Sequence, residues 1–249
     1  MSQGATPGTA GGCAFHDTTG LRLPLIPMRS LHKILPLLLL LMLSLPLPAK
    51  QLVLTGARLW DGTGSEPMDD ATVVIEDGRI TAVGKSDASN FTKQPDADVV
   101  ELKGKYVIPG LISDHSHLGL VKGGKVSPDN YTRETVENQV RQYEGYGVTA
   151  VLSLGLNKDA LYTWRDQQRQ GDFPGADIFS ADRGLGVMKA APPVPLGEDQ
   201  LTRPQSADEA RQYVREMASR RPDMVKLWVD DFFGTVEPKM APEIYRAIY

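Results

Sequence analysis

The sequence predicts a mixed α/β protein in which a small β-domain precedes the first half of a (β/α)₈ barrel. Short β-type runs separated by turn residues fill positions 51–102, and an alternation of strand and helix patterns begins at Tyr106. Such an alternation is typical of a parallel sheet covered by helices. Four strand–helix units follow, about half of the eight that a barrel of roughly 250 residues contains.

Composition excludes several classes of function. With 249 residues and 41% hydrophobic content, the chain can bury a substantial core. The net charge of −4 and the lack of a Lys/Arg block argue against a nucleic-acid partner. Cys13 is the single cysteine, so the chain has neither an internal disulfide nor a cysteine zinc site. Any metal ligands must therefore be histidines, carboxylates or a modified side chain.

Residues 1–49 predict a disordered leader followed by a signal peptide. Arg29 and Lys33 precede the apolar run 34–47, which is shorter than the roughly 20 residues that a membrane-spanning helix needs. We expect export, to the periplasm or outside the cell, with cleavage after Ala49 and Met28 as a possible true start. The alternative is an uncleaved leader that anchors the protein in a membrane, which would be its only membrane contact.

Residues 50–105 predict the small β-domain. The pair Asp77-Gly78 stands between two β-branched runs in ATVVIEDGRITAVG. A two-residue turn with positive φ favours Asp-Gly, so this pair predicts a hairpin.

Residues 106–249 predict four strand–helix units. Gly147 ends the first helix and Ser206 caps the third. The strands are apolar on both faces, as in a sheet covered on both sides, and Trp228 and Tyr146 are expected in the core. The Pro- and Gly-rich loop 182–205 is long enough to cover a site. The expected strands are 106–113, 148–154, 176–181 and 224–229, and the expected helices are 132–146, 159–170, 206–219 and 241–249.

His115 and His117 are the candidate metal ligands. Side chains two apart on an extended backbone project to the same face, and these two lie at the C-terminal end of the first barrel strand. Active sites of such barrels lie at that end, where two imidazoles can share one metal ion. The alternative is a pair of exposed loop histidines. Asp114 points the other way and is expected at most to support the ligands.

Three segments, ARLWDGTG, VVIEDGRITAVG and VIPGLISDHSH, resemble the amidohydrolase superfamily. Its members join a small β-sandwich to a metal-bearing (β/α)₈ barrel through a P-G-[LF]-I-D-x-H-x-H segment. The resemblance covers residues 52–249 and implies a β-sandwich for residues 50–105. It also implies that His115 and His117 bind a divalent metal, most often zinc. Ser113 stands where the family usually has an aspartate, a departure that alters no ligand.

Lys226 is a third candidate ligand, near the end of the fourth predicted strand. Burial between apolar neighbours would disfavour the ammonium and leave a neutral, reactive amine. The alternative is an ordinary lysine whose amine reaches solvent. VKLWVDD is similar to prolidase-like and imidazolonepropionase-like members of the superfamily, in whose binuclear branch a strand-four lysine is carboxylated and bridges two metals. The resemblance therefore implies one or two ions held by the histidines and Lys226.

The resemblance implies hydrolysis of amide-type carbon–nitrogen bonds in a dipeptide or another small molecule such as a cyclic amide. The family mechanism needs two further histidines and an aspartate base, yet no histidine follows His117, so no catalytic residue is assigned. We expect an N-terminal portion of an exported amidohydrolase, shortened by a frameshift, a premature stop or a gene-model error and inactive alone. The alternative is a non-catalytic module that assembles with a complementary C-terminal half. The oligomeric state is not predicted.

Overall fold

The structure is a computed structural model that describes residues 50–87 and 91–249. The predictions for the leader, the signal peptide and its cleavage lie outside the described residues. Within the described ranges, no helix has both the length and the apolar character needed to cross a membrane.

The chain divides into two compact units. The first contains the described residues up to Thr55 together with those between Thr72 and Glu101, and the second contains Gly56–Ala71 and Leu102–Tyr249.

Five strands form the first sheet, in the order β3-β2-β1-β4, with β5 also paired to β1. Both β4 and β5 run parallel to β1. The predicted hairpin is confirmed, because β2 and β3 are joined by Asp77 and Gly78 at φ values of 50° and 71°, as the favoured two-residue turn requires. The β-sandwich expected for this region stays a prediction. The strands are β1 (Leu52–Leu59), β2 (Met68–Glu76), β3 (Arg79–Lys85), β4 (Asp98–Glu101) and β5 (Tyr106–Val107).

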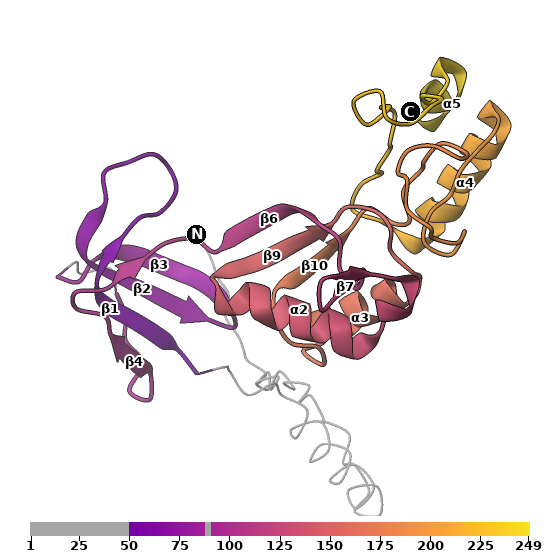
Figure 1. Ribbon diagram of the computed structural model, residues 1–249. Coiled ribbons are helices and arrows are strands. Elements are labelled where there is room, and N and C mark those ends of the chain that lie inside the picture. The colour runs from indigo at the N-terminus through magenta and orange to yellow at the C-terminus, as the bar shows by residue number, and fades with distance from the viewer. Residues whose placement is uncertain (1–49, 88–90) are drawn as a thin grey trace, which may run out of the picture. The chain divides into compact units, whose positions relative to one another are not determined.

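A second sheet of three parallel strands has the order β10-β9-β6, and β6 carries the candidate ligand His115. Helices α2 and α3 lie on one face of it (Figure 1) and form a single core with Val151 and Ile178. The predictions for the second and third strands and for both helices are confirmed to within one residue at each end. The elements are β6 (Leu111–Ser116), α2 (Arg133–Gly145), β9 (Val148–Ser153), α3 (Ala160–Arg169) and β10 (Asp177–Ser180).

The single strand predicted over 106–113 is wrong. Tyr106–Val107 pairs with β1 in the first sheet, and pairing with β9 starts only at Leu111. Pro109 has no N–H to donate to a ladder. At Gly110, a Cβ would lie 2.0 Å from the Thr149 hydroxyl oxygen, so the backbone approaches β9 too closely for any side chain. These two residues separate the strands, and β6 extends to Ser116 instead.

The expectation that the barrel strands are covered on both faces is also wrong for the described residues. Val151 and Ile178 are buried beneath α2 and α3, whereas Ile112 and Phe179 on the opposite face are 73% and 41% exposed. In the described ranges, α2 packs on β9 and α3 packs on β10, both on the first face.

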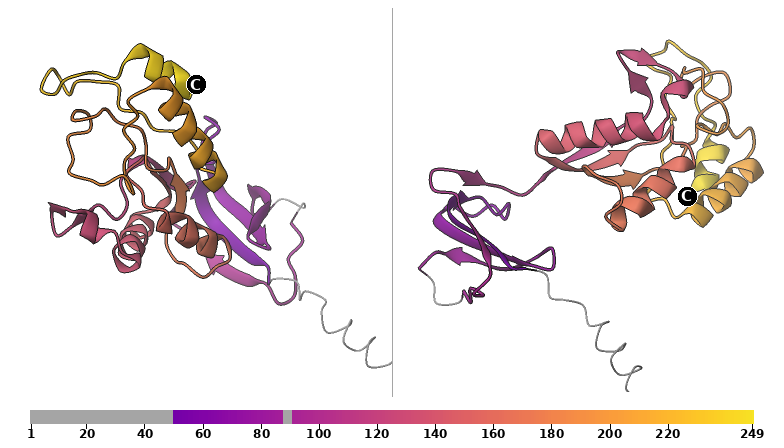
Figure 2. Two further views of the ribbon diagram at one scale, coloured as in Figure 1. Left: turned by 90° about the vertical axis from the view of Figure 1, so that its right-hand side faces the viewer. Right: turned by 90° about the horizontal axis from the view of Figure 1, so that it is seen from below.

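Helices α4 (Ala207–Arg220) and α5 (Pro242–Ile248) pack against each other, as two views show (Figures 1 and 2). Met217 of α4 and Met240, just before α5, share a core with Leu185. The predictions for both helices are confirmed within one residue, including the cap, since Ser206 Oγ accepts a hydrogen bond from the Glu209 N–H at 3.2 Å.

The fourth predicted strand, 224–229, is wrong as a regular strand. It is an extended segment in which only Leu227 forms a bridge, with Leu185. The reason lies in the neighbouring segment: β10 ends at Ser180, and Asp182 takes a positive φ of 54°. The backbone after β10 therefore turns away from residues 224–226 and is extended again only at Leu185. Leu185 also bridges to Thr202, so two short segments share it.

Replacing Ser206 with alanine is expected to lower the free energy of unfolding by about 1 kcal/mol, because the Glu209 N–H at the start of α4 loses its acceptor. Urea denaturation measures this change. Ser219→Ala near the end of the same helix is the control, and as a surface change it should cost about 0.5 kcal/mol or less. Equal costs at the two positions would contradict the assigned cap.

Candidate metal-binding site

The structure brings the two imidazoles together. His115 is exposed in β6 and His117 follows that strand, half-buried. Their ring centroids are 5.3 Å apart and the rings meet edge to face at 77°. On the other side of the strand, Ser116 contacts the hydroxyl of Tyr143 on α2 at 2.9 Å. Ser116 thus faces α2.

The surroundings of His117 favour its neutral form. Burial lowers its pKa; a contact with the Gly155 carbonyl opposes this shift, while the neighbouring charges of His115 and Lys226 add to it. The contact joins His117 Nδ1 to Gly155 O at 3.4 Å. Neutral imidazole is the form that binds metal ions, so at neutral pH this ring has a nitrogen lone pair to offer.

Lys226 lies beside the same glycine. Its Cγ is 3.3 Å from the position that a Cβ would take at Gly155, and its Cβ is 3.4 Å from the corresponding position at Gly184. Its ammonium nitrogen is 5.1 Å from the centre of the Trp228 ring. Gly155 therefore contacts both His117 and Lys226. Because Gly155 has no side chain, both residues can lie close to its backbone.

The donor set fits a divalent metal only with a modified lysine. Within the ranges that the structure describes, no three His, Cys, Asp or Glu side chains gather closely enough to hold a metal ion. A catalytic zinc ion takes three protein ligands in most enzymes. The two imidazoles supply two, and an ammonium has no lone pair for a third. A carboxylated Lys226 would supply the missing oxygen.

The segment after the histidines is a short hairpin held by amides. Gln139 of α2 accepts a hydrogen bond from Gly119 N at 2.7 Å and donates to Val121 O at 2.8 Å. Asn130 donates to Leu120 O at 3.1 Å and to Lys125 O at 2.8 Å. The sequence singled out neither amide, because side-chain bonds to backbone have no periodic pattern. The elements are β7 (Val121–Lys122), β8 (Lys125–Val126) and the 3₁₀ helix η1 (Pro128–Asn130).

A cavity of about 440 Å³ adjoins His117 and is lined on its other side by α2 and its C-terminal end. Tyr146 borders it and is 79% exposed, so the expectation of a core position is wrong for this residue. Trp228 is 7% exposed, which confirms its core position. The loop 182–205 packs over Trp228 and Leu156 through a core that includes Ala191, Leu196 and Leu201.

A buried polar network behind Lys226 was not found from the sequence. The Asp182 carboxylate, 1% exposed, accepts hydrogen bonds from Arg220 Nε at 2.8 Å and Nη2 at 2.9 Å, and from the Tyr162 hydroxyl at 2.6 Å. Burial alone would raise the pKa of Asp182, but the bonds from Arg220 and Tyr162 outweigh it and hold that pKa below its usual value. The partners lie 20 and 38 positions away, and no local sequence pattern links them.

The fold and the site together define the class of protein. Parallel strands alternate with helices, and two imidazoles and a lysine gather where the strands end. This is a mixed α/β protein with a candidate metal site where parallel strands end, the position in which (β/α)₈ barrels carry their active sites.

Comparison with known proteins finds relatives in sequence and in structure. A D-hydantoinase from Streptomyces coelicolor is 34% identical over 89 residues, 34% of this chain and 17% of that protein. An imidazolonepropionase from Rhizobium rhizogenes is 34% identical over 55 residues, 22% of this chain and 13% of that protein. A solved structure described as a prolidase, from Bifidobacterium longum, matches with a TM-score of 0.63 and 23% identity, covering 81% of this chain and 46% of that one. No family model matches.

The hydantoinase and imidazolonepropionase relatives are similar to this chain over its matched segments, in agreement with the resemblance of its motifs to the amidohydrolase superfamily. The chain's relatives, among them a hydantoinase, a dihydroorotase and deaminases, are enzymes that act on carbon–nitrogen bonds. The chain spans 17% of the hydantoinase and about half of the solved structure.

Proposed function

We propose that the protein is a metal-dependent hydrolase of amide-type carbon–nitrogen bonds that acts on a dipeptide or a cyclic amide. The observation that carries the proposal is the meeting of His117 and Lys226 on Gly155, next to the ring of His115. The hydantoinase and imidazolonepropionase relatives support this bond type, and a solved prolidase with a bound phosphonate analogue of a proline compound supports a small substrate.

The residues would act as follows. His115 and His117 would hold one or two divalent ions, most often zinc, through neutral ring nitrogens, and Lys226 would hold them as a carbamate. When bound, such an ion polarises a carbonyl and lowers the pKa of water to about 7. The lowered pKa of His117 keeps its lone pair available near neutral pH. Exposure of His115 on the open face of the sheet leaves room for a small substrate beside it.

Turnover also needs a group that accepts a proton. Among the described residues no Asp or Glu joins the imidazoles in a metal-sized group. We therefore propose that this chain alone binds metal but does not turn substrate over.

The remaining expectations stand as proposals. Residues 50–105 would form the small β-sandwich of the family and residues 106–249 the first four βα units of its barrel, which the match to about half of a solved structure supports. Residues 1–49 would direct export to the periplasm or outside the cell, supported by the charged and apolar pattern of that segment alone.

Zinc content of the purified full chain tests the proposal. After loading and dialysis we expect the parent to retain one or two ions per chain, and His115→Ala and His117→Ala each to lose nearly all of them because too few donors remain. Elemental analysis by mass spectrometry gives the content. Lys103→Ala, at an exposed position outside the candidate site, is the control and should retain zinc. The proposal would be refuted by a parent chain that retains no zinc. It would also be refuted by a variant with both His115→Ala and His117→Ala that retains as much zinc as the parent.

Assembly with a complementary chain is the second candidate function. An open apolar groove of about 860 Å³ favours it, lined by Val225, Leu227, Val229, Met240, Tyr245 and Ile248. Ile112 and Leu111 of β6 are also more than half exposed. Large exposed apolar surfaces mark association sites, so a separately expressed chain that carries the second half of the barrel should co-sediment with this one. No binding between the two chains at high concentration would count against this candidate.

A further inference from the structure

Residues 182–185 connect the polar network to Lys226. On one side, Arg183 O accepts a hydrogen bond from Leu156 N at 2.8 Å. On the other side, Leu185 N donates to Lys226 O at 2.8 Å, and Leu185 O accepts from Trp228 N at 2.9 Å. The backbone of Lys226 is therefore fixed by this segment instead of by a continuous strand.

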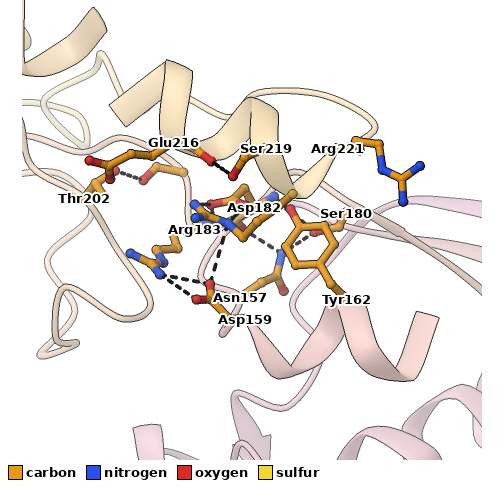
Figure 3. A network of polar contacts seen from close by, with 12 residues as sticks. Asn157, Asp159, Tyr162, Ser180, Asp182, Arg183, Thr202, Glu216, Ser219 and Arg221 are labelled. Carbon is orange, nitrogen blue, oxygen red and sulfur yellow. Dashed lines mark hydrogen bonds and ion pairs between the residues drawn. The ribbon is translucent and has the colours of Figure 1, made fainter. Parts of the chain in front are cut away.

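Asp182 anchors that segment at its start (Figure 3). Its carboxylate accepts hydrogen bonds from Arg220 of α4 and from Tyr162 of α3, and it accepts from Arg183 N at 2.8 Å. Figure 3 shows Tyr162 and Arg183 beside Asp182. Its backbone carbonyl accepts from Asn157 Nδ2 at 2.8 Å. Two helices and the loop after β9 thus converge on one residue.

Stability alone is a weak reason for this arrangement. A buried ion pair is often no more stabilising than well-packed apolar residues of similar volume. Asp182 also has a φ of 54°, a left-handed conformation that costs a residue other than glycine free energy. Strain and a buried charge at one position, next to a candidate site, suggest a functional constraint on the segment that follows.

We propose that Asp182 is a positioning residue that, together with Arg220 and Tyr162, fixes Lys226 against His117. The proposal rests on the proposed function, since it assigns Asp182 a role towards a candidate metal ligand. Asp182 sets the path of residues 183–185, Leu185 fixes the backbone on both sides of Leu227, and the side chain of Lys226 then runs between Gly184 and Gly155. Gly155 in turn contacts His117, so a shift of the segment separates the two candidate ligands.

The test compares Asp182→Asn with the parent as full, metal-free chains. Acetic anhydride labels lysine amines, and mass spectrometry of peptides gives the rate at each lysine. We expect labelling of half-buried Lys226 to rise by about fivefold or more as the segment loosens, while exposed Lys85 and Lys103 label unchanged. The affinity for zinc should fall by about tenfold, as for supporting partners of metal ligands. Unchanged Lys226 labelling in a folded Asp182→Asn protein would overturn the proposal.

Two further variants keep the test decisive. Tyr162→Phe removes one hydrogen bond to Asp182 and leaves the ion pair, so Lys226 labelling should rise by a smaller factor even where Asp182→Asn fails to fold. Val140→Ala creates a cavity in the core beneath α2, and it should lower the unfolding temperature without changing Lys226 labelling or zinc affinity. An equal rise in labelling in Val140→Ala would show that general stability controls Lys226, and would overturn the proposal.

The outcomes separate this inference from the proposed function. A parent chain that binds no zinc, combined with increased Lys226 labelling in Asp182→Asn, refutes the metal site and supports the positioning role. Zinc binding that is equal in the parent and in Asp182→Asn, with equal labelling, supports the metal site and refutes the positioning role.

Discussion

Replacing Arg220 with methionine is expected to lower the free energy of unfolding at pH 7 by about 3–5 kcal/mol, because it leaves a buried carboxylate without its cation. Asp182 is 1% exposed and receives two of its hydrogen bonds from Arg220. Methionine preserves most of the side-chain volume, so the change reports mainly on charge. Urea denaturation of the full chain measures it.

The size of this loss depends on pH in a defined direction. In the parent, the pKa of Asp182 is held below its usual value, so its stabilising contribution is present above about pH 4 and is lost as pH falls through the lowered value. Without Arg220, burial raises that pKa, and the folded variant can take up a proton that relieves the unpaired charge. The difference in unfolding free energy between parent and variant should therefore shrink from pH 7 to pH 4.

Arg211→Met is the matched control in the same helix. Arg211 pairs with Asp208 at 2.8 Å, but that aspartate side chain is 95% exposed. An exposed pair contributes about 1 kcal/mol or less, so this variant should unfold nearly as the parent does at both pH values. A loss at Arg220 no larger than that at Arg211 would contradict the buried network.

The sequence was sufficient to predict those elements whose caps and turn residues are neighbours in the chain. Helix α4 has a cap at Ser206 and acidic residues in its first turn, and the hairpin between β2 and β3 has the Asp-Gly pair that its turn needs. In both cases the residues that determine the structure are neighbours in the chain, so short-range energetics suffice.

The wrong predictions depended on distant partners. Whether 224–229 forms a regular strand is decided by the path of its neighbour after Ser180, where Asp182 is held by Arg220 from 38 positions away. The break before β6 is set by the side chain of Thr149 against Gly110. The spacing of His115 and His117 was sufficient to nominate two candidate ligands, but their proximity to Lys226 depends on two glycines that no motif singled out.

Gly184→Ala is expected to lower the free energy of unfolding by about 2–5 kcal/mol, from the left-handed conformation of the site together with overpacking. Gly184 has a φ of 76°, and a Cβ there would lie 2.5 Å from Trp228 Cζ3 and 3.4 Å from Lys226 Cβ. The indole must move, and Lys226 with it, so the affinity for zinc should fall by about tenfold. Urea denaturation and equilibrium dialysis measure the two effects.

Gly171→Ala separates the two causes of that loss. Gly171 has a φ of 85°, but nothing lies within 4 Å of its Cβ position, so alanine there should cost only the left-handed conformation, about 1–2 kcal/mol, and leave zinc binding intact. The excess loss at Gly184 then measures the contact with Trp228 and Lys226. If Gly184→Ala costs no more than Gly171→Ala and still binds zinc, Trp228 does not hold Lys226 in place, and the lysine must reach the imidazoles by some other constraint.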